Sequence, residues 1–242
     1  MIEIPSLRPE SRYGIPTSDL LLFNRQYIVG YSYLFRQPRW AMQIIGESTI
    51  PMEDEFDRLD NFREDFRIPE KFRSTLNDYK GSGFDRGHLI NSADRKGSKI
   101  INSETFLLSN MSPQKPGFNH VIWLKLEKAV RVLAESGKFA EVYTICGPLF
   151  AIGRKIKMIG DNRVVVPDAF FKSVLAEKAK AQSTNQLAMW SFVIPNAKTK
   201  KPLKNFLVPT VEVERRAGLQ LWDRLRGEKS DALKTKKGGC GR

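Results

Sequence analysis

One amphipathic segment in the middle of the chain constrains the fold more than any other feature. Apolar residues recur there at intervals of three and four: Phe118, Ile122, Leu126, Ala129, Val130 and Leu133. This spacing predicts a helix with one buried face, and Gly137 stands where such a helix would end. The preceding stretch NMSPQKPG is typical of a turn, and its two prolines keep the helix from starting earlier.

Short runs rich in aromatic and β-branched residues lie on both sides of this helix and predict strands. The expected strands are 27–33, 40–45, 105–109, 141–146, 163–166, 188–194 and 206–208, and a second amphipathic helix is expected at 213–225. Strands on both sides of one strong helix favour a mixed α+β domain. We expect a single domain over residues 1–226, followed by a basic tail, 227–242, that is disordered.

The charge of the chain points to a polyanionic partner. Lysine and arginine number 40 against 27 acidic residues, a formal net charge of +13, which makes nucleic acid the leading candidate. A soluble protein that happens to be basic is the alternative. The two cysteines are far apart and lack metal-ligand spacing, so a zinc ribbon and a disulfide scaffold are excluded. Because no signal, transit peptide or membrane span is visible, we expect a cytoplasmic protein without a membrane partner, with export by another route left open.

Polar residues recur every four positions along the expected helix: Asn119, Trp123, Glu127 and Arg131. This spacing predicts that they share one face. A carboxamide oxygen suits magnesium, which keeps most of its waters, so Asn119 is the candidate ligand. Glu127 lies about 12 Å further along the axis and would bond metal-bound water instead. Arg131 could then pair with Glu127, although a solvent-facing polar stripe is the alternative for all four.

A histidine supplies the remaining chemistry for cleaving a phosphodiester. His88, one of two histidines, lies in GSGFDRGHLINSADRKGS. Hydrolysis of a phosphodiester needs an activated water and a cation, and an imidazole can act as the base. Guanidinium groups match phosphate oxygens, so Arg86 and Arg63 are phosphate-binding candidates, although either alone could be a surface charge.

Several blocks of the sequence resemble one known family. GSGFDRGH, TFLLSNMSPQKPGFNHVIWLKLE, CGPLF, VVVPDAFFK and FLVPTVEVERRAGL are similar to successive blocks of the DNA/RNA non-specific endonucleases, most closely the endonuclease G group, over about residues 13–225. The resemblance implies an α+β fold with a largely antiparallel sheet and a ββα-metal, or His-Me finger, active site. It further implies Mg2+ (or Mn2+) as cofactor, DNA and RNA as substrates, 5′-phosphate products and a homodimer.

The resemblance also implies a role for each residue of the catalytic set. His88 is the general base, Asn119 is the sole direct protein ligand of the metal, and Glu127 contacts the metal through water. Arg63 is implied to bind phosphate, and Arg86 is expected to touch phosphate as well.

Four further residues are expected around this set. Asp85 anchors the loop through hydrogen bonds, Asn110 supports the site from behind, and Arg131 fixes Glu127. His120 stands where relatives commonly carry glutamine, and we expect it at the cavity wall or the surface.

Two other functions remain open alongside the general nuclease. One is a nucleic-acid-binding module whose catalytic site has decayed, although the intact His, Asn and Glu argue against it. The other is a toxin or defence effector with an inhibitor or immunity protein, as opposed to an enzyme of nucleic-acid degradation. Since mitochondrial relatives begin with a targeting extension and this chain starts almost at the domain, the expected setting is not mitochondrial, and a bacterial or phage-like one is plausible.

Overall fold

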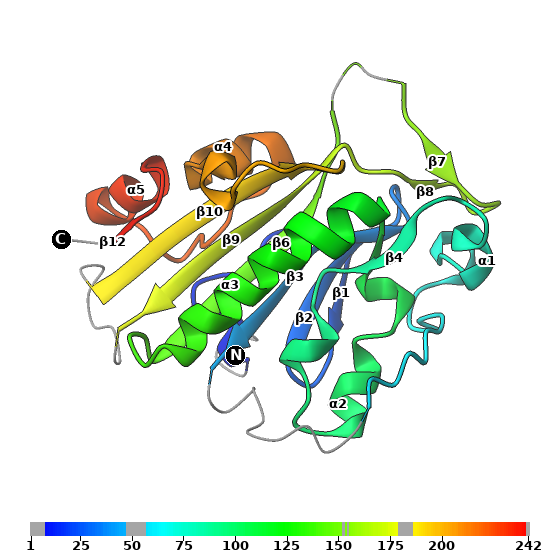
Figure 1. Ribbon diagram of the computed structural model, residues 1–242, viewed down its shortest axis with the longest axis horizontal. Helices are drawn as coiled ribbons and strands as arrows, with labels where there is room; N and C mark the ends of the chain where they lie inside the picture. The colour runs from blue at the N-terminus through cyan, green and yellow to red at the C-terminus, as the bar shows by residue number, and fades with distance from the viewer. Residues whose placement is uncertain (1–7, 47–56, 152, 154, 179–185, 241–242) are drawn as a thin grey trace.

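One antiparallel sheet runs through the centre of the protein (Figure 1). The computed structural model describes residues 8–46, 57–151, 153, 155–178 and 186–240. The sheet has the order β1-β2-β3-β6-β9-β10-β11, and β12 also pairs with β10. Its strands are β1 Leu20–Phe23, β2 Tyr27–Ser32, β3 Gln37–Ile45, β6 Glu141–Leu149, β9 Ala169–Glu177, β10 Leu187–Pro195, β11 Leu207–Val208 and β12 Gly239–Cys240.

In the described part of the chain, two small pairs of antiparallel strands, called hairpins below, and five α-helices lie around this sheet. The hairpins are β4 Asp85–His88 with β5 Met111–Gln114, and β7 Met158–Ile159 with β8 Val164–Val165. The helices are α1 Leu76–Tyr79, α2 Lys99–Glu104, α3 Leu124–Glu135, α4 Thr210–Ala217 and α5 Glu228–Thr235. A π-helix, Phe118–Trp123, leads directly into α3, and short 3-10 helices lie at Pro9–Ser11, Glu70–Phe72, Ser92–Asp94, Leu108–Asn110 and Leu203–Phe206.

The sheet buries a hydrophobic core on each face, because neighbouring residues of a strand point to opposite sides. Val29 and Phe170 pack on one face with Leu126 and Val130 of α3, which lies along the sheet in Figure 1. On the other face, Phe171 packs in a core that includes residues of α4 and α5. The sheet therefore separates the α3 side of the molecule from the α4 and α5 side.

The structure confirms the mixed α+β class and most of the expected elements. The strands expected at 27–33, 40–45, 141–146 and 188–194 are β2, β3, β6 and β10, and those at 163–166 and 206–208 shorten to β8 and β11. The second helix is shorter than expected, because Gly218 adopts a left-handed conformation (φ 61°) that ends α4. β9 has no counterpart among the expected strands, since it is buried throughout and shows no alternation of polar and apolar residues.

Two expectations near the first hairpin are wrong. The run 105–109, expected as a strand, is a turn that leads into the 3-10 helix Leu108–Asn110, and the MSPQ of the expected turn is β5. The side chain of Asn110 causes this arrangement: it donates to the carbonyls of Ile90 and Thr105, both at 2.9 Å, and accepts from the Ile90 amide at 3.0 Å. These bonds turn the chain just before β5 begins.

The tail from Gly227 is ordered in the described part, to residue 240, where the sequence predicts disorder. Leu233 of α5 is 5% exposed in the second core, and Lys234 pairs with Glu214 at 3.0 Å. β12 extends the sheet by pairing with β10. Composition alone predicts disorder here because the segment contributes so little apolar surface, yet one leucine docked beside an ion pair holds the helix. None of the helices in the described ranges is long and apolar enough to span a membrane.

Replacing Leu233 with alanine tests whether this tail contributes to the fold. The change removes a buried side chain from the second core and should lower the free energy of unfolding by ~2 kcal/mol in urea denaturation. Lys236→Ala, at an exposed position three residues after Leu233, serves as the control and should leave the midpoint unchanged. Equal stability of the two variants would show that α5 is not docked in solution.

Candidate active site

The first hairpin presents His88 at the end of β4. His88 is opposite Met111, and Gly87 is opposite Ser112. A Cβ at position 87 would lie 2.1 Å from the side chain of Gln114, so only glycine fits beside the histidine. Asn110, fully buried, fixes the chain just after His88 through its bonds to Ile90. These contacts place Asn110 directly behind the strand that carries His88.

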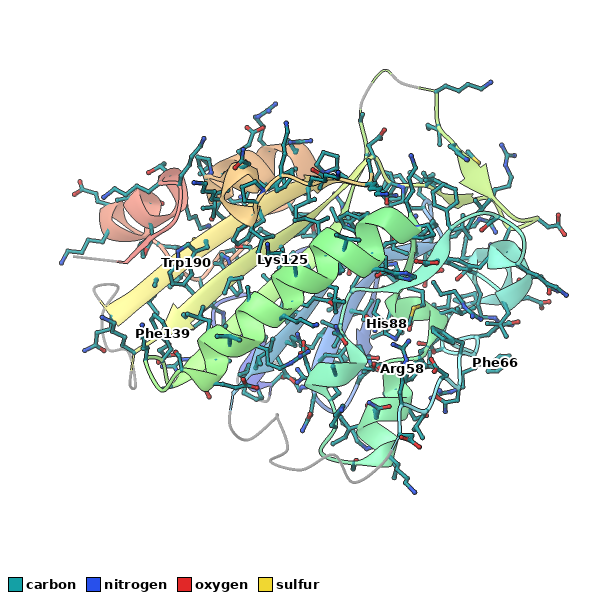
Figure 2. The ribbon with its side chains drawn as sticks, in the orientation of Figure 1. Arg58, Phe66, His88, Lys125, Phe139 and Trp190 are labelled. Carbon is teal, nitrogen blue, oxygen red and sulfur yellow. The ribbon has the colours of Figure 1, made fainter. Side chains whose placement is uncertain are left out.

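One cavity of about 450 Å³ brings together the predicted catalytic residues. His88, Asn119 and Glu127 line it, together with Arg58, Arg86, Asn91 and Arg131. Figure 2 shows His88 and Arg58 as neighbours in this region. The hairpin supplies His88, whereas the π-helix and α3 supply Asn119 and Glu127.

The imidazole of His88 is held neutral. Its ring centroid lies 5.1 Å from that of Phe106 and 5.6 Å from that of Phe62, and its Nε2 is buried with no hydrogen-bond partner among the described residues. Burial, with a smaller contribution from the positive charges of Arg58 and Arg86, lowers the pKa of His88 to about 3. A neutral imidazole at physiological pH can accept a proton, as a general base must.

Asp85 orients Asn119. The Asn119 Nδ2 donates to Asp85 Oδ2 at 2.9 Å, which leaves the amide oxygen Oδ1 without a hydrogen-bond partner in the described structure. The same Asp85 oxygen lies 3.0 Å from Nε2 of His120, whose side chain is 67% exposed and lines the cavity. Asp85 therefore connects the π-helix to the hairpin, in addition to any role within its own loop. His120 lies at the cavity wall.

Glu127 is buried, with one oxygen held and the other free. Its Oε2 accepts a hydrogen bond from Asn91 Nδ2, and its Oε1 is buried with no partner among the described residues. Burial raises the pKa of Glu127 to about 7, against the opposing effects of Lys172, Asn91 and Arg131. Any cation bound in the cavity would favour the ionised carboxylate.

Asn91 is a residue of the site that sequence reasoning missed. Its Oδ1 accepts from the amide of Ala93 at 2.8 Å and caps the 3-10 helix Ser92–Asp94. This bond fixes the orientation of the carboxamide, so Nδ2 must point toward Glu127. Asn91 lies three residues after His88 and directly before a short 3-10 helix. This position is typical of a capping asparagine and could have identified it from the sequence.

Arg131 does not pair with Glu127, contrary to the expectation. Its guanidinium donates to Asp94 Oδ1 from Nε at 3.0 Å and from Nη2 at 2.6 Å. Asp94 also accepts from Gln43 Nε2 at 3.1 Å, so this group ties α3 to β3. Asp94 is only 1% exposed and attracts the arginine because a buried carboxylate needs a partner.

The spacing of four predicts that Trp123 shares a face with Asn119 and Glu127, but in the structure it does not. It is 1% exposed, and its ring packs against Phe118 and Phe170 in the core. The cause is the π-helix Phe118–Trp123, whose wider turn places Leu124, five residues after Asn119, at the cavity wall.

Of the two arginines expected at phosphate, the structure places only Arg86 at the cavity. The Arg86 guanidinium lies 4.1 Å from the ring centre of Phe62. Arg63 is outside the residues that line the cavity, and its Nη1 donates to the carbonyls of Asn61 and Ser103 at 3.3 and 2.9 Å. Arg58, and not Arg63, lines the cavity together with Arg86. The sequence did not indicate Arg58 because its charged segment has no hydrophobic periodicity.

These residues fit a metal ion that takes few protein ligands. The described residues contain no cluster of three or more His, Cys, Asp and Glu side chains that could hold a metal. The unpartnered oxygens of Asn119 and Glu127 instead offer one neutral and one acidic acceptor at the same cavity. This donor set suits a hydrated hard cation such as Mg2+.

Comparisons with known proteins agree with this geometry. A family model described as DNA/RNA non-specific endonuclease matches residues 8–228. Nuclease C1 of Cunninghamella echinulata var. echinulata is 37% identical over 226 residues, covering 88% of this chain and 87% of the relative. Human mitochondrial endonuclease G is 36% identical over 219 residues, covering 86% and 71%. The solved structure of an EndoG/EndoGI complex, which concerns inhibition of EndoG, contains a chain that superposes with a TM-score of 0.83 at 34% identity, covering 90% of this chain and 91% of its own.

The names of several relatives correct one expectation. Human endonuclease G, nuclease 1 of Schizosaccharomyces pombe and the mitochondrial nuclease of Saccharomyces cerevisiae are named as mitochondrial proteins. The expectation of a cytoplasmic protein conflicts with these relatives and is wrong. It rested on the beginning of the chain, which carries no information about the compartment.

The neutral state of His88 can be measured directly because the chain has only two histidines. The imidazole signal of His88 is identified in ¹H–¹⁵N NMR spectra of the metal-free protein as the one that His88→Ala removes. This signal should keep the chemical shifts of a neutral imidazole down to about pH 4, consistent with a pKa of about 3. The unfolded chain protonates this group near pH 6.5, so its contribution to stability is complete above that pH and is lost as the pH falls toward 3. Titration of this signal near pH 6.5 would contradict the burial argument.

Proposed function

The chain belongs to the DNA/RNA non-specific endonuclease family and is a nuclease, and from this premise we propose that it hydrolyses phosphodiester bonds with Mg2+ and with His88 as general base. The observation that carries the proposal is the shared cavity of His88, Asn119 and Glu127. The proposed products carry 5′-phosphates, as the family resemblance implies.

His88 can take the proton of the attacking water. Its Nε2 is shielded, so Nδ1 is the ring nitrogen available to the cavity. Because the pKa of His88 is lowered to about 3, the imidazole is free to accept at neutral pH, and the proton it gains must pass on to solvent quickly. The rings of Phe62 and Phe106 pack beside the imidazole and keep it in place.

Asn119 and Glu127 would hold the magnesium ion, the first through Oδ1 and the second through metal-bound water. When bound, Mg2+ supplies positive charge that stabilises the phosphate and the departing oxygen. Mn2+ fits the same oxygen donors. Asp85 and Asn91 prepare the two side chains: each bonds one end of its partner and leaves an oxygen free.

Arg58 and Arg86 are proposed to bind phosphate oxygens on either side of the cleaved bond. Both line the cavity beside His88, and guanidinium groups keep their charge at all physiological pH values. Arg63 supports the same segment through its carbonyl contacts. A site built from groups that address phosphate and metal gives little base preference, which suits both DNA and RNA.

The homodimer, an inhibitory partner and the biological setting remain proposals. The solved relative is an EndoG in complex with EndoGI, and its title concerns inhibition of EndoG. We propose that this chain forms a homodimer, as the family resemblance implies, and that an inhibitor can restrain it. A defence or toxin role and general nucleic-acid degradation both use the proposed chemistry.

His88→Ala tests the general base. Supercoiled plasmid cleavage in Mg2+ should fall about 1,000-fold, because the water loses its proton acceptor, whereas plasmid binding should change little. Retained cleavage would exclude His88 as the base. The wild-type assay with and without a chelator also decides against a decayed binding module, which would not cut plasmid under either condition.

Asn119→Ala tests the metal ligand. Cleavage should require roughly tenfold more Mg2+ for half-saturation, because the carboxamide oxygen is lost. Asn205→Ala, at an exposed position in the 3-10 helix Leu203–Phe206, is the matched control and should keep the wild-type Mg2+ curve. An unchanged curve for Asn119→Ala would contradict its assignment as ligand.

A further inference from the structure

A second cavity of about 480 Å³ adjoins the active site. It shares Arg58, Arg86, Asn119 and His120 with the cavity of His88. Its own walls come from α1 and the segment that joins α1 to β4, including Tyr79, Lys80 and Phe84. A polymer bound across His88 would therefore extend directly into this second cavity.

The walls of the second cavity combine aromatic faces with cations. The Arg86 guanidinium lies 4.1 Å from the ring centre of Phe62, and Lys80 lines the same cavity as Phe84. Lys157, whose Nζ lies 4.7 Å from the ring centre of Phe84, lines a different cavity that Phe84 also borders. Tyr79 is 5% exposed, and its hydroxyl is buried without a hydrogen-bond partner among the described residues. Aromatic rings beside cations form the kind of surface on which bases stack while phosphates are neutralised.

The charge of the cavity is positive and largely uncompensated. Lys80 and Arg86 form no ion pair within the described ranges, whereas Arg58 pairs with Asp60 at 2.7 Å. The one carboxylate of the wall, Asp85, already bonds Asn119 and His120 through the same oxygen. The unmatched cations therefore favour an anionic ligand.

The platform that carries Lys80 is rigid. α1 begins with a capping box in which Thr75 and Asp78 bond each other, and Asp78 Oδ2 also accepts from Asn162 Nδ2 at 3.0 Å. Gly160 packs so closely on Asp78 that a Cβ there would lie 2.2 Å from its Oδ1. Lys80 directly follows this anchored turn, so it is presented to the cavity from a preformed position.

We propose that the second cavity is a subsite for the nucleotide that adjoins the cleaved phosphodiester, with Lys80 on its phosphate and Phe84 against its base. The proposal rests on the nuclease function and adds where the neighbouring nucleotide lies. Stacking on an aromatic ring tolerates any base, so the subsite adds affinity without strict sequence choice.

The subsite can be tested by binding, without turnover, in the His88→Ala background. A fluorescein-labelled single-stranded twelve-nucleotide DNA is titrated by anisotropy at several salt concentrations. Lys80→Met should weaken binding about fivefold and reduce the slope of log affinity against log salt by about 0.7, the value for one phosphate contact to a single strand. Lys229→Met on α5, across the sheet, removes the same charge and should leave both values unchanged.

An abasic strand separates the two halves of the proposal. Phe84→Leu should weaken binding of the normal strand at least fivefold and leave binding of the abasic strand unchanged, whereas Lys80→Met should weaken both. If Lys80→Met binds both strands as tightly as its parent, the phosphate contact is overturned. If Phe84→Leu binds the normal strand as tightly as its parent, the base contact is overturned. Displacement of the strand from the parent by 5′-AMP at equal concentration would mean that the cavity serves free nucleotides instead, which also overturns the proposal.

Two controls keep the result readable. A melting temperature is measured for each variant, and Lys80→Gln replaces Lys80→Met if the latter unfolds; Phe84→Tyr, which keeps the ring, should restore binding to the normal strand. Plasmid cleavage by the wild-type protein is measured separately. If the wild-type protein does not cleave plasmid, the nuclease function is rejected. If it cleaves plasmid but Lys80→Met and Phe84→Leu bind the strand as tightly as the parent, only the subsite is rejected.

Discussion

The hydrogen bond from Asn119 to Asp85 is the contact on which the arrangement of the site depends. It joins the hairpin that carries His88 to the helix that carries Glu127, two segments that are separated in the chain by more than a strand and a turn. The bond uses the nitrogen of the carboxamide and so determines which atom of Asn119 is left for a ligand. Asn91 acts on Glu127 in the same way from the other side of the cavity.

Burial has opposite effects on the two titratable groups of the site and moves both toward their neutral forms. It lowers the pKa of His88 to about 3 and raises that of Glu127 to about 7. The neutral histidine is the reactive form of a base, whereas the neutral glutamic acid is not the form that bonds metal-bound water. The metal-free site is thus prepared for proton transfer and incompletely prepared for the cation, which would complete it by ionising Glu127.

Sequence reasoning could find the chemistry of the site but not all of its neighbours. His88, Asn119 and Glu127 stand out because their residue types and order match a known reaction site, and the structure brings them to one cavity. Spacing failed for Trp123, because an α-helical period cannot foresee a π-turn. Arg58 and the Arg131–Asp94 pair depend on contacts between distant segments, which no local pattern encodes.

The π-turn at the start of the long helix faces two neighbours at once, the hairpin and the sheet. Within this turn, Asn119 contacts the hairpin through Asp85, whereas Phe118 and Trp123 pack against Phe170 of the sheet. Beyond Leu124, Leu126 and Val130 of α3 pack on the same face of the sheet. The wider turn changes the angular spacing of the side chains, so the carboxamide of Asn119 can point to the hairpin while the rings of Phe118 and Trp123 point to the sheet. Substitutions in the sheet can therefore change the packing surface of α3 while the Asn119 carboxamide keeps its orientation toward Asp85.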